Sequence, residues 1–479
     1  MQGPGISSEA IWTAFEAMTT AETRYPKWGL SISWLRQQDS GVGFATVGSS
    51  LVGGIDLVKG VGVSAVTSLD LFEYADETDR VISVNYDRRL TEPLGGTSIG
   101  LMTVLLDNSD KRFTPDYNGT IGTAILPKRP VNAHIGFLVR GQTKLISIFK
   151  GLTKRPEERK ERRNSKIECQ DYVSYLNGIP LESAKYKDQR TDEIIEDILS
   201  GLGFGSSQYA LDTGLNTIAF AYFQKGVSAG YVISKLCESE EAVFYVDENG
   251  ILRFENRRKY SQAPYTVSQH TIGASDIISW EEAKGIRIIN KVIVKAKPRV
   301  IRTIQDVWSY SGELEIEAGA TSTVWSTLID PVDAITDPAS TTDYTAFTAT
   351  GGGGANITAD IDIDIDKFTT SAKLEITNNN ASKAYVNLLK LRATPATYID
   401  SDGVSSEISE VYQDDDSINK YDEQEYTIEN NYVDDGEFAL ELAQHIVNKY
   451  KNPNKFIKLK VQGIPHLQLR DKILVEDFN

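Results

Sequence analysis

The feature that most constrains the fold of this 479-residue chain is a long succession of short β-type segments between residues 27 and 185. Segments such as WGLSISWL (28–35) alternate apolar and polar residues, as strands with one buried face do, and turn residues separate them. Many strands before any long helix predict a barrel or a rolled sheet. We therefore assign residues 27–185 to a first barrel-like domain. Apolar residues at helical spacing between Ile11 and Met18 predict a helical arm in residues 1–26.

The composition changes near Arg190, where helical patterns begin. TDEIIEDILSGLGF (191–204) and SAGYVISKLCESE (228–240) each carry an apolar stripe, and AVFYVDENGILRFEN (242–256) is typical of a hairpin. The glycines at 201, 203 and 205 follow a helix instead of linking a strand to one, so they indicate a helix end and not a phosphate loop. Residues 186–275 are predicted to form an α+β module.

Strand patterns return at Asp276 and are interrupted by a segment of different composition. Residues 311–404 are rich in Thr, Ser, Ala and Asp, which favours an inserted β-sandwich. A helix and two strands near the C-terminus cannot bury themselves, so they should complete the sheet begun near Ile278. Residues 276–310 and 405–479 then form a second barrel-like domain, and the fold class is mainly β with an α+β module.

The residue inventory gives no positive support for an enzyme, and no cofactor or metal is expected. Cys169 and Cys237 lie far apart and the four histidines are scattered singly, so neither disulfide nor zinc patterns occur. No nucleophile elbow or Walker loop is present. The DIDIDID run (360–366) fits an edge strand with Ile inward and Asp outward. Calcium binding is the alternative, although an EF-hand spacing is absent.

Charge is concentrated in two segments. The net charge is −17, and residues 400–437 hold fourteen acidic residues against Lys420. This block predicts one face or loop with a strong local field and disfavours binding to DNA phosphates. Residues 154–166 (KRPEERKERRNSK) are basic, and the interleaved Glu residues also allow a simple solvated hairpin.

Aromatic residues of the predicted insert form another candidate group. Trp308 and Trp325, with Tyr310, Tyr344 and Phe347 nearby in sequence, could stack on sugar rings, or they could belong to the sandwich core.

Three passages resemble the tail-hub proteins of tailed bacteriophages and of related contractile injection machines. The first passage lies in the first barrel-like domain, where residues 87–115 are similar to a pattern that ends in "LxN-x-D-x-RFxP" and residues 149–176 to a "G-basic hairpin-x-D" segment. Residues 191–256 share the helix-helix-hairpin order of the hub's middle module. The closing passage, 417–477, looks like "S-I-x-x-Y-G…A-x-x-L-A…P…G-x-P-x-L-x-x-G-D-x-V", with Asp422 and Arg470 where Gly is commoner.

This resemblance implies a structural protein of the virion tail tip, assembled in the host cytoplasm. It implies a homotrimer whose two barrel-like tube domains per subunit form a pseudo-sixfold ring that joins the tail tube to the tip. DNA would pass through without specific binding, and partners would be other tail proteins: the tube or distal tail protein, the tape measure, and tip or fibre proteins. A glycan-binding adhesin is the alternative, and a cell-wall hydrolase a weaker one.

In such a ring, two charged groups acquire roles. The acidic block would face the DNA channel or remain a solvated outer loop, and its channel-facing candidates are Asp414, Asp415, Asp416, Asp422 and Glu423. The basic hairpin would contact a neighbouring subunit or tail protein through Arg159, Arg162 and Arg163.

Overall fold

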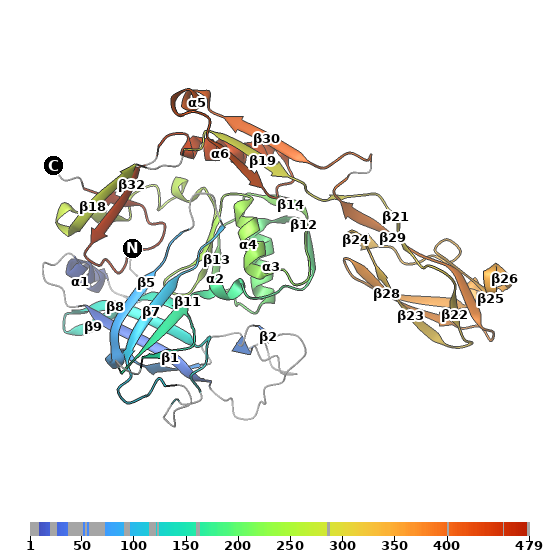
Figure 1. Cartoon of the computed structure of the whole chain (residues 1–479), viewed down its shortest axis with the longest axis horizontal. Coiled ribbons are helices and arrows are strands. Elements are labelled where there is room, and N and C mark those ends of the chain that lie inside the picture. The colour runs from blue at the N-terminus through green and yellow to red at the C-terminus, as the bar shows by residue number, and fades with distance from the viewer. Residues whose placement is uncertain are drawn as a thin grey trace.

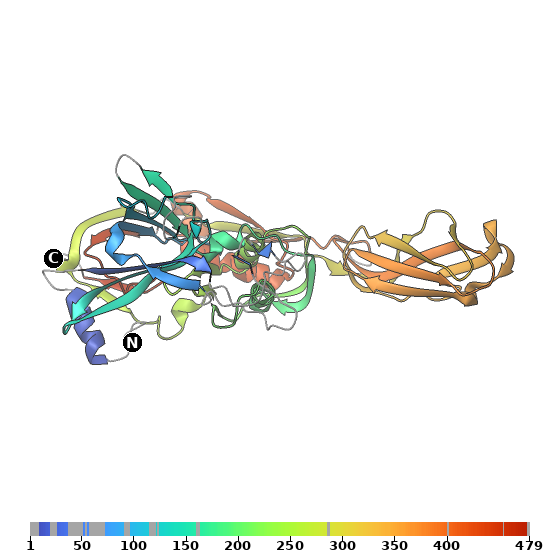
Figure 2. The same cartoon turned by 90° about the horizontal axis from the view of Figure 1, so that it is seen from below.

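The computed structural model of the chain describes residues 9–19, 26–36, 51–52, 55–56, 72–90, 96–114, 121, 124–159, 163–284, 288–399, 402–453 and 455–476. As the sequence predicts, the fold is mainly β with an α+β module. Most of the sheets and, in the described residues, all of the α-helices form one large lobe, and an elongated β lobe projects from it (Figures 1 and 2).

The first part of the chain forms an eight-stranded rolled sheet with the order β4-β1-β8-β9-β11-β7-β5, and β10 pairs with β11. Its core follows from alternation, because Met102, Val104 and Leu106 on one strand are all buried. Helix α1 (Glu9–Thr19) packs its Trp12 and Phe15 against the end of the β8–β9 pair. The strands are β1 (Lys27–Arg36), β4 (Phe72–Asp76), β5 (Val81–Asp87), β7 (Leu101–Asp107), β8 (Pro130–Val139), β9 (Gln142–Thr153), β10 (Glu157–Arg159) and β11 (Asn164–Gln170), with a separate pair β2 (Leu51–Val52) and β3 (Ile55–Asp56).

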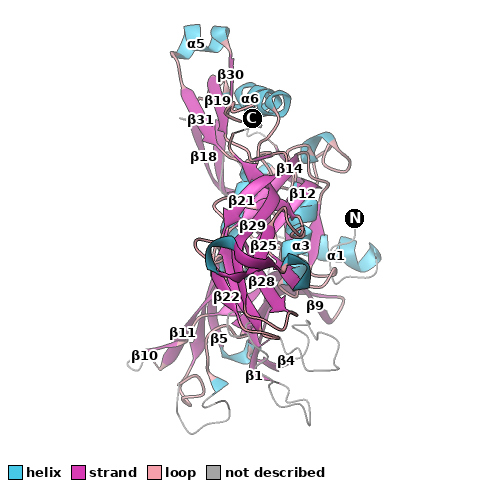
Figure 3. Cartoon of the chain, turned by 90° about the vertical axis from the view of Figure 1, so that its right-hand side faces the viewer, coloured by secondary structure: helices cyan, strands magenta, loops and turns pink. Residues whose placement is uncertain are grey.

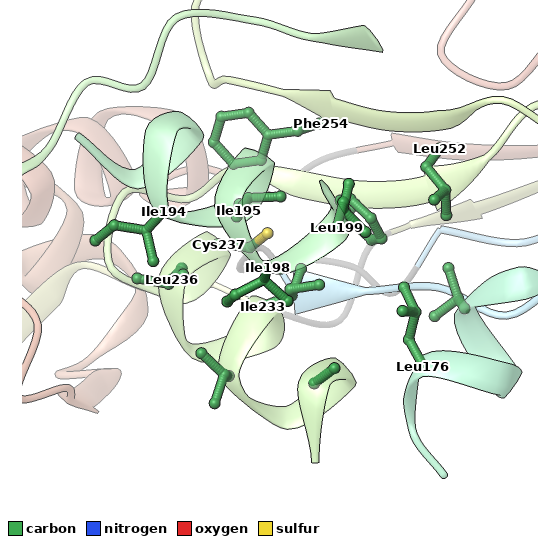
Figure 4. Packing of buried hydrophobic residues seen from close by; sticks show 14 of the residues in the cluster. Leu176, Ile194, Ile195, Ile198, Leu199, Ile233, Leu236, Cys237, Leu252 and Phe254 are labelled. Atoms are coloured by element: carbon green, nitrogen blue, oxygen red, sulfur yellow. The ribbon is translucent and has the colours of Figure 1, made fainter. Parts of the chain in front are cut away.

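The middle module contains the largest of the hydrophobic clusters. Helices α2 (Tyr172–Leu176), α3 (Thr191–Gly201) and α4 (Ala229–Glu238) pack with the sheet β13-β16-β15-β6 (Figure 4). The predicted hairpin is confirmed: β15 (Val243–Val246) and β16 (Leu252–Glu255) flank a turn in which Gly250 has a φ of 80°. The predicted helix end is also confirmed, since the Phe204 N–H bonds back to the Leu199 carbonyl.

Three pairings in this module join strands that are not consecutive in the sequence. Strand β6 (Gly96–Thr97) comes from the first part of the chain and pairs in parallel with β15. Strand β12 (Ala184–Arg190) pairs with β14 (Thr217–Phe223), and β13 (Tyr209–Leu211) pairs with β16. The module therefore begins before residue 186, because Tyr172, Val173 and Leu176 of α2 belong to its core.

The C-terminal part differs from the single barrel-like domain that the sequence suggested. In the described residues it consists of a β30-β19-β31 sheet covered by helix α6 (Gly436–Tyr450), and two separate strand pairs. Strand β18 (Ile277–Lys284) does pair with β32 (Lys455–Val461), as expected, but β33 (Ile473–Val475) pairs in parallel with β17 (His270–Ile272). The sheet strands are β19 (Lys291–Ala296), β30 (Ile408–Gln413) and β31 (Glu425–Glu429), and α5 (Asp415–Tyr421) connects the last two.

The insert is a β-sandwich, and it starts earlier than residue 311. Its long strand β29 (Ala384–Thr397) pairs with β20 and β21, which the sequence assigned to the second barrel-like domain, because the strands continue directly into the sandwich. A second sheet has the order β23-β28-β27. The strands are β20 (Val300–Ile301), β21 (Gln305–Ser309), β22 (Leu314–Ile316), β23 (Thr321–Thr327), β24 (Val332–Ile335), β25 (Tyr344–Ala349), β26 (Gly353–Asn356), β27 (Ile361–Lys367) and β28 (Ser371–Asn378).

Candidate functional site

The segment LDNSDKRFTP (106–115) forms a tightly bonded turn after β7 in its described part, residues 106–114. The side-chain oxygen of Asn108 accepts the Phe113 N–H at 2.7 Å, and its amide donates to the Thr114 hydroxyl at 3.1 Å. Lys111 in the middle of the turn has a φ of 62°. These bonds hold the fully buried Phe113 ring in the core of the first sheet. The motif therefore has a structural role.

Arg112 of the same turn neutralises a carboxylate that the fold buries. Glu77 is 1% exposed and accepts hydrogen bonds from Arg112 at 2.7 Å and from the Trp34 indole at 2.9 Å. A buried carboxylate is costly unless it is paired and hydrogen-bonded, so these three residues stabilise the sheet as a unit.

The "x-D" of the basic-hairpin segment is also explained by the structure. Asp171 caps helix α2 by accepting the N–H groups of Val173 and Ser174, and it accepts the Gly100 N–H as well. Burial raises the pKa of Asp171 to about 7, against the effect of these backbone donors. The residue links the first sheet to the middle module.

The closing passage departs from the family pattern at two positions, and both have left-handed backbone. Asp422 has a φ of 62° and Arg470 a φ of 64°, conformations that favour glycine. The Asp422 carbonyl accepts the Asn290 amide at 2.8 Å, and the Arg470 guanidinium pairs with Glu255 at 3.1 Å.

An ionic contact joins the C-terminal part to the middle module. Glu441, His445 and Lys449 lie one turn apart on α6. Lys449 and His445 approach Glu241, which is buried, at 2.8 and 3.2 Å, and Glu441 pairs with Arg257. Burial opposes ionisation of Glu241, but the hydrogen bond to His445 and the charge and hydrogen bond of Lys449 outweigh it and lower the pKa of Glu241. Spacing on α6 could have suggested the stripe, but nothing in the sequence identifies its partners.

A second unpredicted cluster lies under helix α1. The His466 ring contacts Trp12 and Phe15, with ring centroids 5.4 and 6.4 Å apart, and the His270 ring at 4.9 Å. His270 Nε2 lies 3.0 Å from Asp471 Oδ2. Burial, reinforced by His270 and opposed by Asp471, lowers the pKa of His466 to about 4.

The structure brings the acidic candidates together on and around helix α5, the exposed end of the C-terminal sheet (Figure 3). They are not equivalent. Asp414 caps α5 and pairs with Lys451 at 2.9 Å, while Glu423 pairs with Lys291 at 3.0 Å. Asp415 and Asp416 are exposed residues of the first turn of the helix.

The basic hairpin is described only in part. Arg162 and the Arg159 side chain lie outside the described residues, and Arg163 is an exposed turn residue with a φ of 52°. The proposed subunit contact of these three residues stays a prediction.

The structure separates the two candidate glycan-stacking tryptophans. Trp308 is half-buried, lies on β21 and packs against the sandwich core and Tyr310. Trp325 is 59% exposed and lies on β23 in the other sheet, where it is paired with the exposed Phe368 ring. The sequence analysis did not include Phe368 among the stacking candidates, although Phe368 directly follows the strand that contains most of the DIDIDID run. That strand is β27, with Ile361 buried and Asp362, Asp364 and Asp366 exposed, as the edge-strand interpretation predicts.

Within the described residues, no group of three or more His, Cys, Asp or Glu side chains could hold a metal ion. No helix in that part of the chain is long and apolar enough to cross a membrane.

No protein-family model and no curated protein matches the chain. Among the solved structures that it resembles are tail proteins and related machinery. One is the 43 kDa tail protein of prophage MuSo2 from Shewanella oneidensis (11% identity, TM-score 0.32), where the match covers 46% of this chain and 61% of that chain. Prophage tail protein gp18 from Listeria monocytogenes has 8% identity and a TM-score of 0.35, with coverages of 80% and 77%. The E. coli c3393 protein, a component of the type VI secretion system, has 12% identity and a TM-score of 0.26, with coverages of 69% and 79%. The chain thus spans about three fifths of the Shewanella protein.

Proposed function

We propose that the chain is a structural tail-hub subunit of a tailed bacteriophage or a related injection machine. In this role it has no catalytic function. It forms a homotrimeric ring at the virion tail tip, contacts other tail proteins and lets DNA pass.

The observation that carries the proposal is the backbone at Asp422 and Arg470. A glycine in a family pattern marks a position that needs a left-handed backbone. The tail-hub pattern places Gly at these two positions, and the chain keeps a positive φ at both although neither residue is glycine. A chance match of a loose pattern does not explain that agreement.

The other matched passages support the same proposal through their structural roles. Asn108, Phe113 and Asp171 each occupy a motif position and each fixes a junction of the fold. Their side chains are engaged with the backbone and the core and are therefore not available for catalysis. Motif residues that hold elements of the fold in place are what we expect of an assembly component.

The acidic helix α5 fits a channel lining better than a binding site for cations. Asp415 and Asp416 extend from the end of a small sheet, where three copies in a ring could bring them near a common axis (Figure 3). A negative channel surface would repel the DNA backbone weakly and avoid salt-dependent retention.

The proposal is tested by measuring where the chain is found and in how many copies. Quantitative mass spectrometry of purified particles should show three copies per tail, against a tube protein that occurs in multiples of six. Absence of the chain from purified tails, or its presence in one copy per tube subunit, would refute a hub role.

A further inference from the structure

The outer face of the β23-β28-β27 sheet combines exposed aromatic rings with ordered rows of polar side chains. Trp325 is 59% exposed and Phe368 is 48% exposed. Their ring centroids lie 6.0 Å apart and the ring planes are inclined by only 19°. Two large exposed rings next to each other form an apolar surface of the kind that marks a binding site.

The strand register arranges the polar side chains of this face in rows that cross the three strands. Neighbouring strands lie about 4.8 Å apart, so the groups of each row are evenly spaced. The rows are Trp325–Lys373–Asp366, Thr323–Glu375–Asp364 and Thr321–Thr377–Asp362.

This face is not required for the core of the insert. The alternate residues Ala372, Leu374 and Ile376 of β28 point inward and are fully buried. The outward residues are held by local contacts instead. Lys373 pairs with Glu375 at 2.5 Å, and the hydroxyls of Thr321 and Thr377 lie 2.8 Å apart. The outer face is therefore preformed and rigid, which reduces the entropy cost of binding.

We propose that this face binds a glycan chain. The Trp325 and Phe368 rings stack on the apolar faces of pyranose rings. The neighbouring row of Thr323, Glu375 and Asp364 forms hydrogen bonds with the sugar hydroxyls. Hydroxyls can both donate and accept, so a row of threonine and carboxylate groups suits them. The proposed sugar-binding rings are therefore Trp325 and Phe368. They are not Trp308 and Trp325, the two candidates from the sequence, because Trp308 packs against the core.

Charge complementarity restricts the class of glycan. The three rows carry four carboxylates (Asp362, Asp364, Asp366 and Glu375) and one ammonium (Lys373), a formal charge of −3. Phosphate-bearing and uronic-acid polymers are repelled by such a surface. Neutral, N-acetylated and amino sugars fit it. The insert projects from the rest of the chain in two perpendicular views, so an extended polysaccharide can reach it (Figures 1 and 2).

The test is to titrate the full chain with four hexasaccharides and to measure binding by Trp fluorescence and by calorimetry. The probes are β-1,4-linked hexamers of glucose, N-acetylglucosamine and glucosamine, and a hexamer of galacturonic acid. At least one of the first three should bind, and the galacturonate hexamer should not. Trp325→Ala and Phe368→Ala should each weaken binding about tenfold or more. Trp325→Tyr should retain most of the affinity, and Trp308→Phe is the matched control that should leave it unchanged.

Three outcomes would overturn the proposal: no binding of any neutral or amino hexamer, binding that survives Trp325→Ala together with Phe368→Ala, or an equal loss in Trp308→Phe. A change of oligomeric state in Trp325→Ala would assign the rings to a protein contact and would also overturn it. The inference does not depend on the hub role, since glycan binding and trimer formation are read separately.

Discussion

At two positions where the tail-hub pattern has glycine, the chain keeps a positive φ although another residue occupies the position. Asp422 has a φ of 62° and a ψ of 167°, a region that glycine occupies almost alone. Its carbonyl holds Asn290, whereas its carboxylate is exposed. Arg470 also has a positive φ, but its side chain pairs with Glu255. The strain is thus compensated at Arg470 and not at Asp422.

The Asp422→Gly variant is expected to be more stable than the parent chain by about 1 kcal/mol, because glycine removes the backbone strain and the side chain makes no buried contact. Chemical denaturation measures the change. Asp416→Gly, in the neighbouring helix α5, is the control and should lose about 0.5–1 kcal/mol. A loss of stability in Asp422→Gly would contradict the strained backbone.

His466 predicts a pH dependence with a defined sign. Its pKa is about 4 in the folded chain and about 6.5 in the unfolded chain, so the unfolded chain binds the proton first as the pH falls. The contribution of the neutral ring is fully present above pH 6.5 and is lost as the pH falls towards 4. Between pH 7 and 4.5, the parent chain should lose about 1–2 kcal/mol more than His466→Gln, since the ring is partly exposed. Parallel pH profiles of the two proteins would contradict the buried neutral ring.

At the scale of elements, the local pattern predicted most helices and strands, whereas most long-range pairings, unlike that of β18 with β32, were not predictable. The helix at residues 9–19, the hairpin around Gly250 and the exposed edge strand β27 all follow from periodicity and turn residues. Parallel pairs such as β6 with β15 join segments almost 150 residues apart, and β6 has only two residues, too few to carry a periodic signal. The parallel pairing of β33 with β17 was not predicted for the same reason.

The candidate site residues could be recognised in the sequence, but their partners in the fold could not. Asp414 and Glu423 are visible as acidic residues in the sequence, but their partners Lys451 and Lys291 come from other elements. Likewise, Trp325 was visible as an aromatic residue, whereas its exposure and its neighbour Phe368 depend on the sandwich register.

The turn that follows β7 provides a prediction at this scale. Asn108→Ala should lower the free energy of unfolding by about 1–3 kcal/mol, because the buried Phe113 N–H loses its acceptor. Thermal and urea unfolding measure the loss. Ser109→Ala, at the exposed neighbouring position, should change stability by less than about 0.5 kcal/mol. Equal effects of the two substitutions would mean that the motif does not hold the turn.

At the scale of the whole molecule, the acidic block separates into structural and unassigned charges. Asp414 and Glu423 contribute to a helix cap and an ion pair, so substituting them would disturb the fold. Asp422 lies at a strained backbone position, so substituting it would change the stability of the chain as well as its charge. Asp415 and Asp416 are the better probes of a channel. Replacing both with Asn should leave the assembly intact and slow DNA ejection, because phosphate is then repelled less. If the variant assembles normally and its rate of DNA ejection is unchanged, α5 lies on the outside of the ring.

The proposed tail-hub role depends most directly on the formation of a threefold ring. Light scattering coupled to size exclusion, with images of the same peak, measures this for the purified chain. We predict a mass of about 159 kDa, three times the 53.0 kDa of one chain, and ring-shaped particles with threefold symmetry. A stable 53.0 kDa monomer at the highest soluble concentration, with no ring in the images, would contradict the tail-hub role.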